Sequence, residues 1–170
     1  SGSSPLGLVR TALARLNPLR QRRAMPAVGA PAPDFDLPDQ RGQRVRLSAL
    51  RGKRVVLWFY PKADRLGDIQ GKGFRDRSPD YEAAGIVILG LSFDPPETNR
   101  AFATKFGFPF RLLSDERREA ALAYGAAESS SDAFPRRVTF VIDAEGQVEQ
   151  ALTTRDPAAQ AEDLARQLID

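Results

Sequence analysis

The 170-residue chain contains no cysteine and no histidine. Without thiols it cannot form disulfides, thiolate metal sites or a thiol redox centre, and without imidazole it cannot form a Ser-His triad. Only metals that accept oxygen ligands stay possible. A chain without thiols is compatible with oxidising and with reducing compartments, so its cysteine content does not indicate a location.

The first 33 residues also lack acidic side chains, and their basic residues are all arginines: Arg10, Arg15, Arg20, Arg22 and Arg23. The formal net charge of +3 therefore belongs to an N-terminal arm, residues 1–24, because the remaining chain is close to neutral. Apolar residues recur in the arm at helical spacing (Leu6, Val9, Leu13, Leu16), and Pro18 interrupts this amphipathic pattern. The arm has no apolar run long enough to span a bilayer or to form the core of a signal peptide.

Three roles for the arm stay open. The favoured one is a helix that packs on the domain or on a neighbouring protein, so the expected partner is a second copy of the chain or another protein. A targeting or membrane-surface segment is the second alternative, and a nucleic-acid or disordered tail is the third; we expect no nucleic acid as a partner. A bacterial cytoplasmic location is favoured, although arginine-rich, acid-free leaders are also typical of organelle targeting.

Residues 25–170 have the length of one domain, and the whole chain has the composition of a soluble globular protein, with 42% hydrophobic and 28% charged residues. A proline-rich segment, residues 26–38, reads as an extended linker into short strands. Strand and helix patterns then alternate, and Asp94 is expected to cap the second long helix. The strands are expected at residues 55–60, 86–91, 110–113, 137–142 and 147–152, and the helices at 68–84, 94–106, 115–124 and 157–169. This alternation predicts an α/β fold.

The most informative segment is residues 60–68, which read YPKADRLGD. It follows an apolar strand pattern and precedes a helix, which is where α/β folds commonly place their chemistry. The segment resembles the peroxidatic loop of the peroxiredoxins. Four other motifs resemble that family in the same order: GAPAPDF from residue 29, GKGFRD from 71, ILGLS from 88 and RVTFVID from 137. Residues 25–170 are accordingly identified as a member of the peroxiredoxin family (AhpC/TSA superfamily), in its bacterioferritin-comigratory or Q-type branch.

The resemblance implies a thioredoxin-like α/β fold, with a central mixed sheet flanked by helices. It implies an active site at Asp68 and Arg137, with Tyr60, Pro61 and Arg65 forming the pocket. In this chain Asp68 stands in place of the reactive cysteine, and Arg65 replaces the residue that orients the peroxide. Compared with the family's motif, the loop is also one residue short beside Asp68. A carboxylate cannot pass through the sulfenic acid of the peroxidase cycle, so thiol peroxidase activity is expected to be absent. No cofactor and no metal are expected.

Three interpretations of Asp68 stay open. The favoured one is a helix N-cap that accepts a backbone N–H. In the second, Asp68 pairs with Arg137 and imitates the charged or over-oxidised cysteine. In the third, Asp68 is a catalytic acid, base or nucleophile. Arg65 either extends into solvent or lies at the pocket mouth, and Arg137 is expected to be an ion-pair partner.

Two further patterns are weak evidence. The carboxylates of Asp64 and Asp68, and those of Asp76 and Asp80, have a helical spacing that could bind a hard cation, but a solvated face is the commoner outcome. Six aromatic residues are expected to form core, with self-association through an aromatic surface as the alternative: Trp58, Phe59, Phe102, Phe106, Phe108 and Phe110.

Two functions follow from these patterns. The first is a peroxiredoxin-like protein that has lost peroxidase activity and serves as a binding or regulatory module. The second is a repurposed enzyme in which Asp68 is the acid or base, while Arg137 and Arg65 hold an anionic substrate. The first is favoured because the sequence adds no new catalytic set. A third explanation is that the cysteines were removed by engineering. It is less favoured, because position 65 and the loop length also differ from the family's motif, whereas an engineer would make a single substitution.

Overall fold

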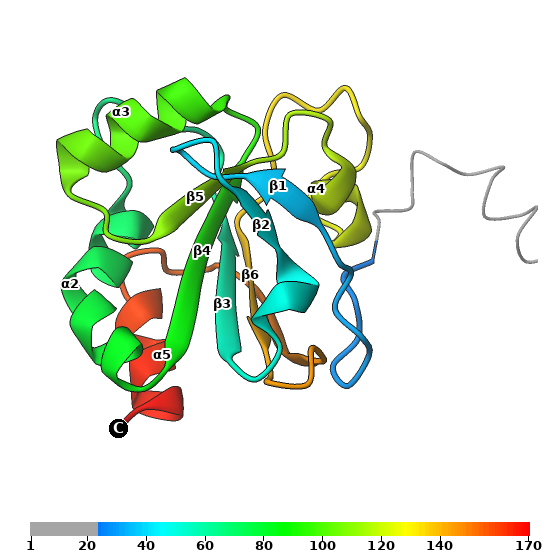
Figure 1. The fold of residues 1–170 in the computed structure, drawn as a ribbon, viewed down its shortest axis with the longest axis vertical. Helices are drawn as coiled ribbons and strands as arrows, with labels where there is room; N and C mark the ends of the chain where they lie inside the picture. Colours follow the sequence, from blue (N-terminus) through cyan, green and yellow to red (C-terminus); the bar gives the residue numbers. More distant parts are fainter. Residues whose placement is uncertain (1–23) are drawn as a thin grey trace, which may run out of the picture.

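The computed structural model describes residues 24–170, which form a five-stranded sheet with helices on both faces (Figure 1). The strands lie in the order β5-β4-β3-β6-β7. Their bounds are β3 Arg54–Phe59, β4 Ile86–Ser92, β5 Arg111–Ser114, β6 Val138–Ile142 and β7 Val148–Thr153. The first three are mutually parallel, whereas β6 and β7 add on antiparallel. The expected mixed sheet is therefore confirmed.

The helices divide between the two faces of this sheet (Figure 1). Alternate residues of β3 point to opposite faces, as the strand period requires: Val56 and Trp58 belong to one apolar cluster, and Val55 and Leu57 to the other. The first cluster lies under α2 Ile69–Ala83, α3 Pro96–Phe106 and α5 Gln160–Leu168. The second lies under α4 Glu119–Ala123, the 3-10 turn η1 Leu47–Leu50 and the two-stranded sheet of β1 Asp36–Pro38 and β2 Arg44–Arg46.

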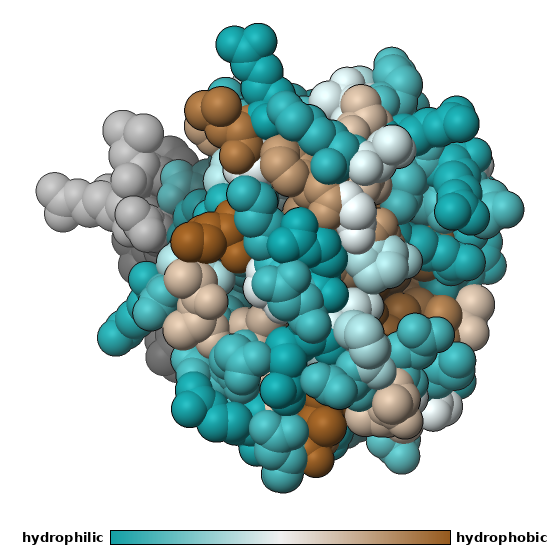
Figure 2. Space-filling view, turned by 90° about the vertical axis from the view of Figure 1, so that its left-hand side faces the viewer, coloured by the Kyte–Doolittle hydropathy of each residue, from teal (hydrophilic) through white to brown (hydrophobic). Residues whose placement is uncertain are grey.

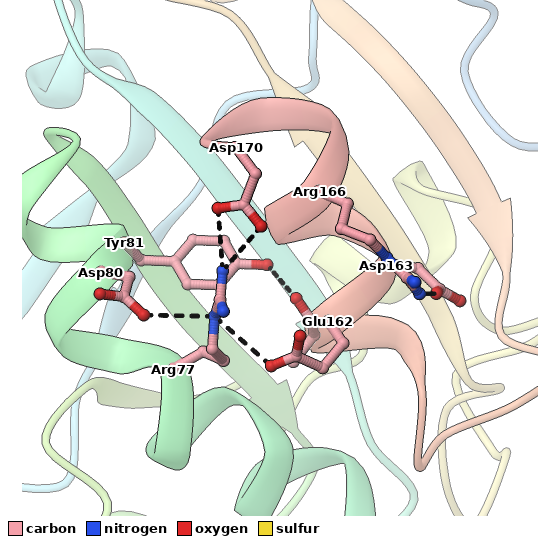
Figure 3. A network of polar contacts seen from close by, with 8 residues as sticks. Arg77, Asp80, Tyr81, Glu162, Asp163, Arg166 and Asp170 are labelled. Atoms are coloured by element: carbon pink, nitrogen blue, oxygen red, sulfur yellow. Dashed lines mark hydrogen bonds and ion pairs between the residues drawn. The ribbon is translucent and has the colours of Figure 1, made fainter.

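Polar contacts join α2 to α5 beside the first cluster (Figure 3). The Arg77 guanidinium lies 3.2 Å from a carboxylate oxygen of Asp170 and 3.5 Å from one of Glu162. The buried Tyr81 hydroxyl donates to the Ala161 carbonyl at 2.8 Å. These contacts fasten the C-terminal helix to α2, the helix that begins at Asp68.

The prediction that Asp94 caps α3 is wrong. The N-cap of that helix is Pro95, and it makes no side-chain cap bond. The Asp94 carboxylate instead accepts from the Ala63 N–H at 2.7 Å and from the Ser92 hydroxyl at 2.9 Å. Because these two donors come from the β3–α2 loop and the end of β4, Asp94 secures the loop that leads to Asp68.

The linker interpretation of residues 26–38 is also wrong for its first part. The Gly29 N–H donates to the Val148 carbonyl, and the Val148 N–H donates to the Ala30 carbonyl, both at 2.8 Å. The segment is therefore hydrogen-bonded to β7 and belongs to the domain. The predicted amphipathic helix of the arm falls at residues 1–23, outside the described residues.

Candidate functional site

The N-cap interpretation of Asp68 is confirmed. Asp68 has an extended backbone at the N-cap of α2, and its Oδ1 accepts the Gly71 N–H at 3.0 Å. The residue is only 5% exposed. A helix start carries unpaired N–H groups and a partial positive charge, so a carboxylate is stabilised in this position.

Arg137, the residue before β6, faces the same carboxylate. Its Nη2 lies 2.5 Å from Asp68 Oδ2, and its Nη1 lies 3.3 Å from Asp68 Oδ1. This is a two-point ion pair in which each oxygen of the carboxylate meets one nitrogen of the guanidinium. The structure thus brings together the two residues that the sequence places at the family's active site, although they lie 69 positions apart.

A buried polar network behind this pair was not predicted. The Gln70 Oε1 accepts from Arg137 Nη1 at 3.0 Å, and the Gln70 amide donates to Thr139 Oγ1 at 3.2 Å. The Thr139 hydroxyl donates in turn to Gln160 Oε1 of α5 at 2.6 Å. The only signal in the sequence is Thr139 itself, a polar residue within the otherwise apolar strand 138–142. Arg137 is therefore restrained by its hydrogen bond to Gln70 as well as by its ion pair with Asp68.

Tyr60 is fully buried and contributes no free hydroxyl to the site. Its hydroxyl donates to Asn99 Oδ1 of α3 at 2.7 Å. Burial raises the pKa of Tyr60 well above its usual value, and the nearby Asp94 and Asp68 carboxylates add to this. Tyr60 therefore stays a neutral hydrogen-bond donor that ties the end of β3 to α3, and the half-buried Pro61 follows it.

Arg65 is exposed, and its guanidinium makes no hydrogen bond or ion pair with the described residues. Only its backbone carbonyl is engaged, since it accepts from Lys105 Nζ at 2.6 Å. The solvent alternative therefore describes Arg65, and its guanidinium makes no contact with Asp68 or Arg137. The neighbouring Leu66 and Ile69 are exposed as well, at 82% and 58%.

The weaker patterns resolve into structural roles. Asp68, Asp76 and Asp80 each pair with an arginine. Within residues 24–170, no three acidic side chains gather as a metal site would require. Of the six aromatic residues, five are buried and Phe106 is half-buried. On the face that carries α2 and α3, apolar residues appear as separate spots among polar ones (Figure 2).

The mixed sheet, the charged residue at the start of α2 and the arginine that faces it from just before β6 define a thioredoxin-like protein of the peroxiredoxin type. The AhpC/TSA family matches residues 28–151, and the chain belongs to this family, in its Bcp/PrxQ branch. Unlike a working thiol peroxidase, it has no cysteine anywhere in its 170 residues.

Named relatives support this assignment. The chain is 38% identical to peroxiredoxin Bcp of Escherichia coli over 141 residues, which cover 79% of this chain and 85% of that protein. It is 39% identical to the chloroplastic peroxiredoxin Q of Triticum aestivum over 122 residues, which cover 71% of this chain but only 56% of the wheat protein.

Solved structures agree with the fold. Peroxidoxin BcpB of Mycobacterium tuberculosis superposes with a TM-score of 0.76 at 31% identity, covering 85% of this chain and 97% of that one. The bacterioferritin comigratory protein of Xanthomonas campestris, described by its alkyl peroxide reduction activity, gives 0.72 at 29% identity, covering 79% and 89%. No helix in the part of the chain that the structure describes is long and apolar enough to cross a membrane.

Proposed function

We propose that this protein has lost thiol peroxidase activity and serves as a non-catalytic binding or regulatory module on a peroxiredoxin fold. The observation that carries the proposal is the Asp68–Arg137 pair. The position where the family holds its thiolate is occupied by a carboxylate, which the helix start and the arginine stabilise as an anion.

The geometry supports a structural role for this carboxylate over a catalytic one. A general base must reach the proton that it abstracts, directly or through one water. Both Asp68 oxygens already accept hydrogen bonds, and the side chain is 3% exposed. The Arg65 guanidinium makes no contact with Asp68 or Arg137, so the described contacts do not join Arg65 and Arg137 into one site for an anionic substrate. The repurposed-enzyme alternative therefore has no specific observation in its favour.

The proposed partner is a second copy of the chain or another protein, contacted through the arm, and the proposed location is the bacterial cytoplasm. The arm supports the first part because its pattern of leucines and arginines is typical of a helix that packs on a surface.

The test is a peroxidase assay with thioredoxin, thioredoxin reductase and NADPH. We expect hydrogen peroxide and an alkyl hydroperoxide to be consumed at the rate of buffer alone, while peroxiredoxin Bcp of Escherichia coli serves as the positive control. Reductant-dependent peroxide loss that rises with the concentration of this protein would overturn the proposal.

A further inference from the structure

A groove of about 510 Å³ lies between α3 and the turn that joins β1 to β2. It is lined by Gln40, Arg41, Arg100, Ala103, Thr104 and Phe108. None of these residues belongs to the Asp68–Arg137 pair or to the polar network behind it.

The two groove arginines have no partner among the described residues. Arg41 and Arg100 are exposed, and neither guanidinium makes a hydrogen bond or an ion pair with residues 24–170. The neighbouring Arg44 and Arg46, by contrast, both pair with Asp36. Two unpaired arginines on one groove form a positive site that is open to an anion.

One wall of the groove is held in place by hydrogen bonds. The buried Asp39 carboxylate accepts the Arg41 N–H at 2.8 Å and the Gln43 N–H at 2.9 Å. The Gln40 amide donates to the Phe110 carbonyl at 3.1 Å, and its oxygen accepts the Leu112 N–H at 2.8 Å. The turn that carries Arg41 is therefore anchored, which lowers the entropy cost of binding.

The opposite wall is one face of α3. Arg100, Ala103 and Thr104 are three and four positions apart, so they share a side of the helix. The floor between the charged groups is the small exposed part of Ala103 and Phe108, which are 7% and 6% exposed. The Phe108 ring stacks on Phe110 with 5.3 Å between the centroids. The groove thus combines guanidinium and hydroxyl donors with an apolar floor.

We infer that this groove binds a small phosphate ester, with its phosphate held by Arg41 and Arg100 and its apolar body on Phe108. Guanidinium forks match phosphate oxygens in pairs of hydrogen bonds, and the hydroxyl of Thr104 adds a further donor. The inference deepens the binding role proposed above, and rests on it for the expectation that binding is the protein's task.

The experiment is calorimetric titration of the full chain with phenyl phosphate, and in parallel with inorganic phosphate, benzoate and phenol. We expect saturable binding of phenyl phosphate, weaker binding of inorganic phosphate, and still weaker binding of benzoate and phenol. Arg41→Gln and Arg100→Gln should each weaken phenyl phosphate binding by about tenfold or more, since each removes a charged hydrogen-bond donor. Higher salt should weaken binding as well, because the groove is open to solvent.

The matched control is Arg117→Gln, which removes an exposed arginine outside the groove. Its nearest partner, Glu119, is 3.9 Å away. We expect this variant to bind as the wild type does. An absence of saturable binding, equal weakening by Arg117→Gln, or tighter binding of benzoate than of phenyl phosphate would overturn the inference.

The outcome is separable from that of the peroxidase assay. Peroxidase turnover together with phenyl phosphate binding would end the proposed function and leave the groove site standing. An inactive protein that does not bind phenyl phosphate would leave the loss of peroxidase activity standing and remove the groove site.

Discussion

The two arginine sites of this protein differ in what surrounds the guanidinium. Arg137 is 26% exposed and is paired with Asp68 and Gln70, whereas Arg41 and Arg100 are exposed on an open groove and pair with no described residue. The first site carries its own anion, and the second is free to take one from solution. Arginine alone therefore does not indicate a binding site; the presence or absence of an internal carboxylate decides.

The two sites are close neighbours. Phe108, the floor of the groove, packs on Gly71 in the first turn of α2, where an added Cβ would lie 2.8 Å from the Phe108 ring. The N–H of that same Gly71 donates to Asp68. One glycine thus separates the closed site from the open one.

The largest expected effect is a loss of stability when the carboxylate of the Asp68–Arg137 pair is removed. Arg137 would then lack a carboxylate partner, as Arg41 and Arg100 do, and the difference between the two sites would disappear. Asp68→Ala removes the N-cap and leaves Arg137 without its carboxylate, so we expect a loss of about 2–4 kcal/mol in the free energy of unfolding. Asp68→Asn should cost less, because an amide oxygen still caps the helix. Urea denaturation of the three proteins, with and without phosphate, measures this.

Added phosphate should stabilise Asp68→Ala more than the wild type, because both proteins keep the groove but only the variant has an uncompensated arginine at the helix start. Equal stability of wild type and Asp68→Ala would show that the pair contributes nothing to the fold.

The next effect concerns activity and asks whether only the sulfur is missing from the first site. Asp68→Cys should stay about a hundredfold or more below a working family member in peroxide turnover. The resemblance to the family places Arg65 where a peroxide-orienting residue is expected, and a misplacement of about 1 Å can cost a hundredfold in rate. Peroxidase assays on Asp68→Cys, with Asp68→Ser as the inactive control, measure this. Family-like turnover from the single change would contradict it.

A third change, Gly71→Ala, alters the contact between Gly71 and Phe108, which lies between the Asp68–Arg137 pair and the groove. Gly71→Ala places its Cβ 2.8 Å from the Phe108 ring and 3.0 Å from the Trp58 ring. We expect a destabilisation of about 1–3 kcal/mol from overpacking, together with weaker phenyl phosphate binding in the groove. Gly73→Ala, whose Cβ would lie 3.4 Å from the Ala161 Cβ and 3.8 Å from the Ala158 carbonyl oxygen, is the control. If both variants are equally stable, the contact between Gly71 and Phe108 is not tightly packed.

The effect of pH on stability can be compared between Asp68, which is paired with an arginine, and Asp115, another buried carboxylate. Asp115 accepts the Ala120 and Ala121 N–H groups but has no ion-pair partner among the described residues, and burial raises its pKa above the usual 3.8. Because the folded pKa is raised, its contribution to stability is present below about pH 3.8 and is lost as pH rises through the folded value. Relative to Asp115→Asn, the wild type should lose stability over that window. Carboxyl NMR titration and melts across pH would test it, and a flat difference would count against the raised pKa.

The smallest effect concerns the groove. Glu97 lies one turn before Arg100 in α3 and makes no ion pair with it in the structure. Glu97→Gln removes a nearby negative charge, so phenyl phosphate should bind about two- to threefold more tightly, as expected for an exposed charge pair. The control is Glu116→Gln, which removes an acidic side chain outside the groove. Tighter binding by both variants would indicate a general effect of net charge.

Much of the fold and part of the site could be predicted from the sequence, for identifiable reasons. The apolar periods and the glycine after α2 specify the strands and helices, and the family motifs place Asp68 and Arg137 together. The role of Asp94 could not be predicted from the sequence, because an aspartate that caps a helix and one that accepts a hydrogen bond from a distant loop have the same local sequence. Gln70 and Gln160 meet only through tertiary packing, 90 positions apart.

The groove was missed for the same physical reason. Arg41 and Arg100 look like any surface arginines until the fold shows which charges lack a partner. Sequence motifs report what a family's site once needed, whereas unpaired charge is visible only in three dimensions.

Gln40 has one further consequence, for self-assembly. Edge strands expose backbone groups that can pair with another molecule and start a fibre. At the edge of the sheet, the Gln40 side chain satisfies the Leu112 N–H of β5 and the carbonyl of Phe110, the residue before that strand, much as an adjacent strand would. A single amide thus occupies two of the backbone groups at that edge and so opposes the addition of a strand from a neighbouring molecule.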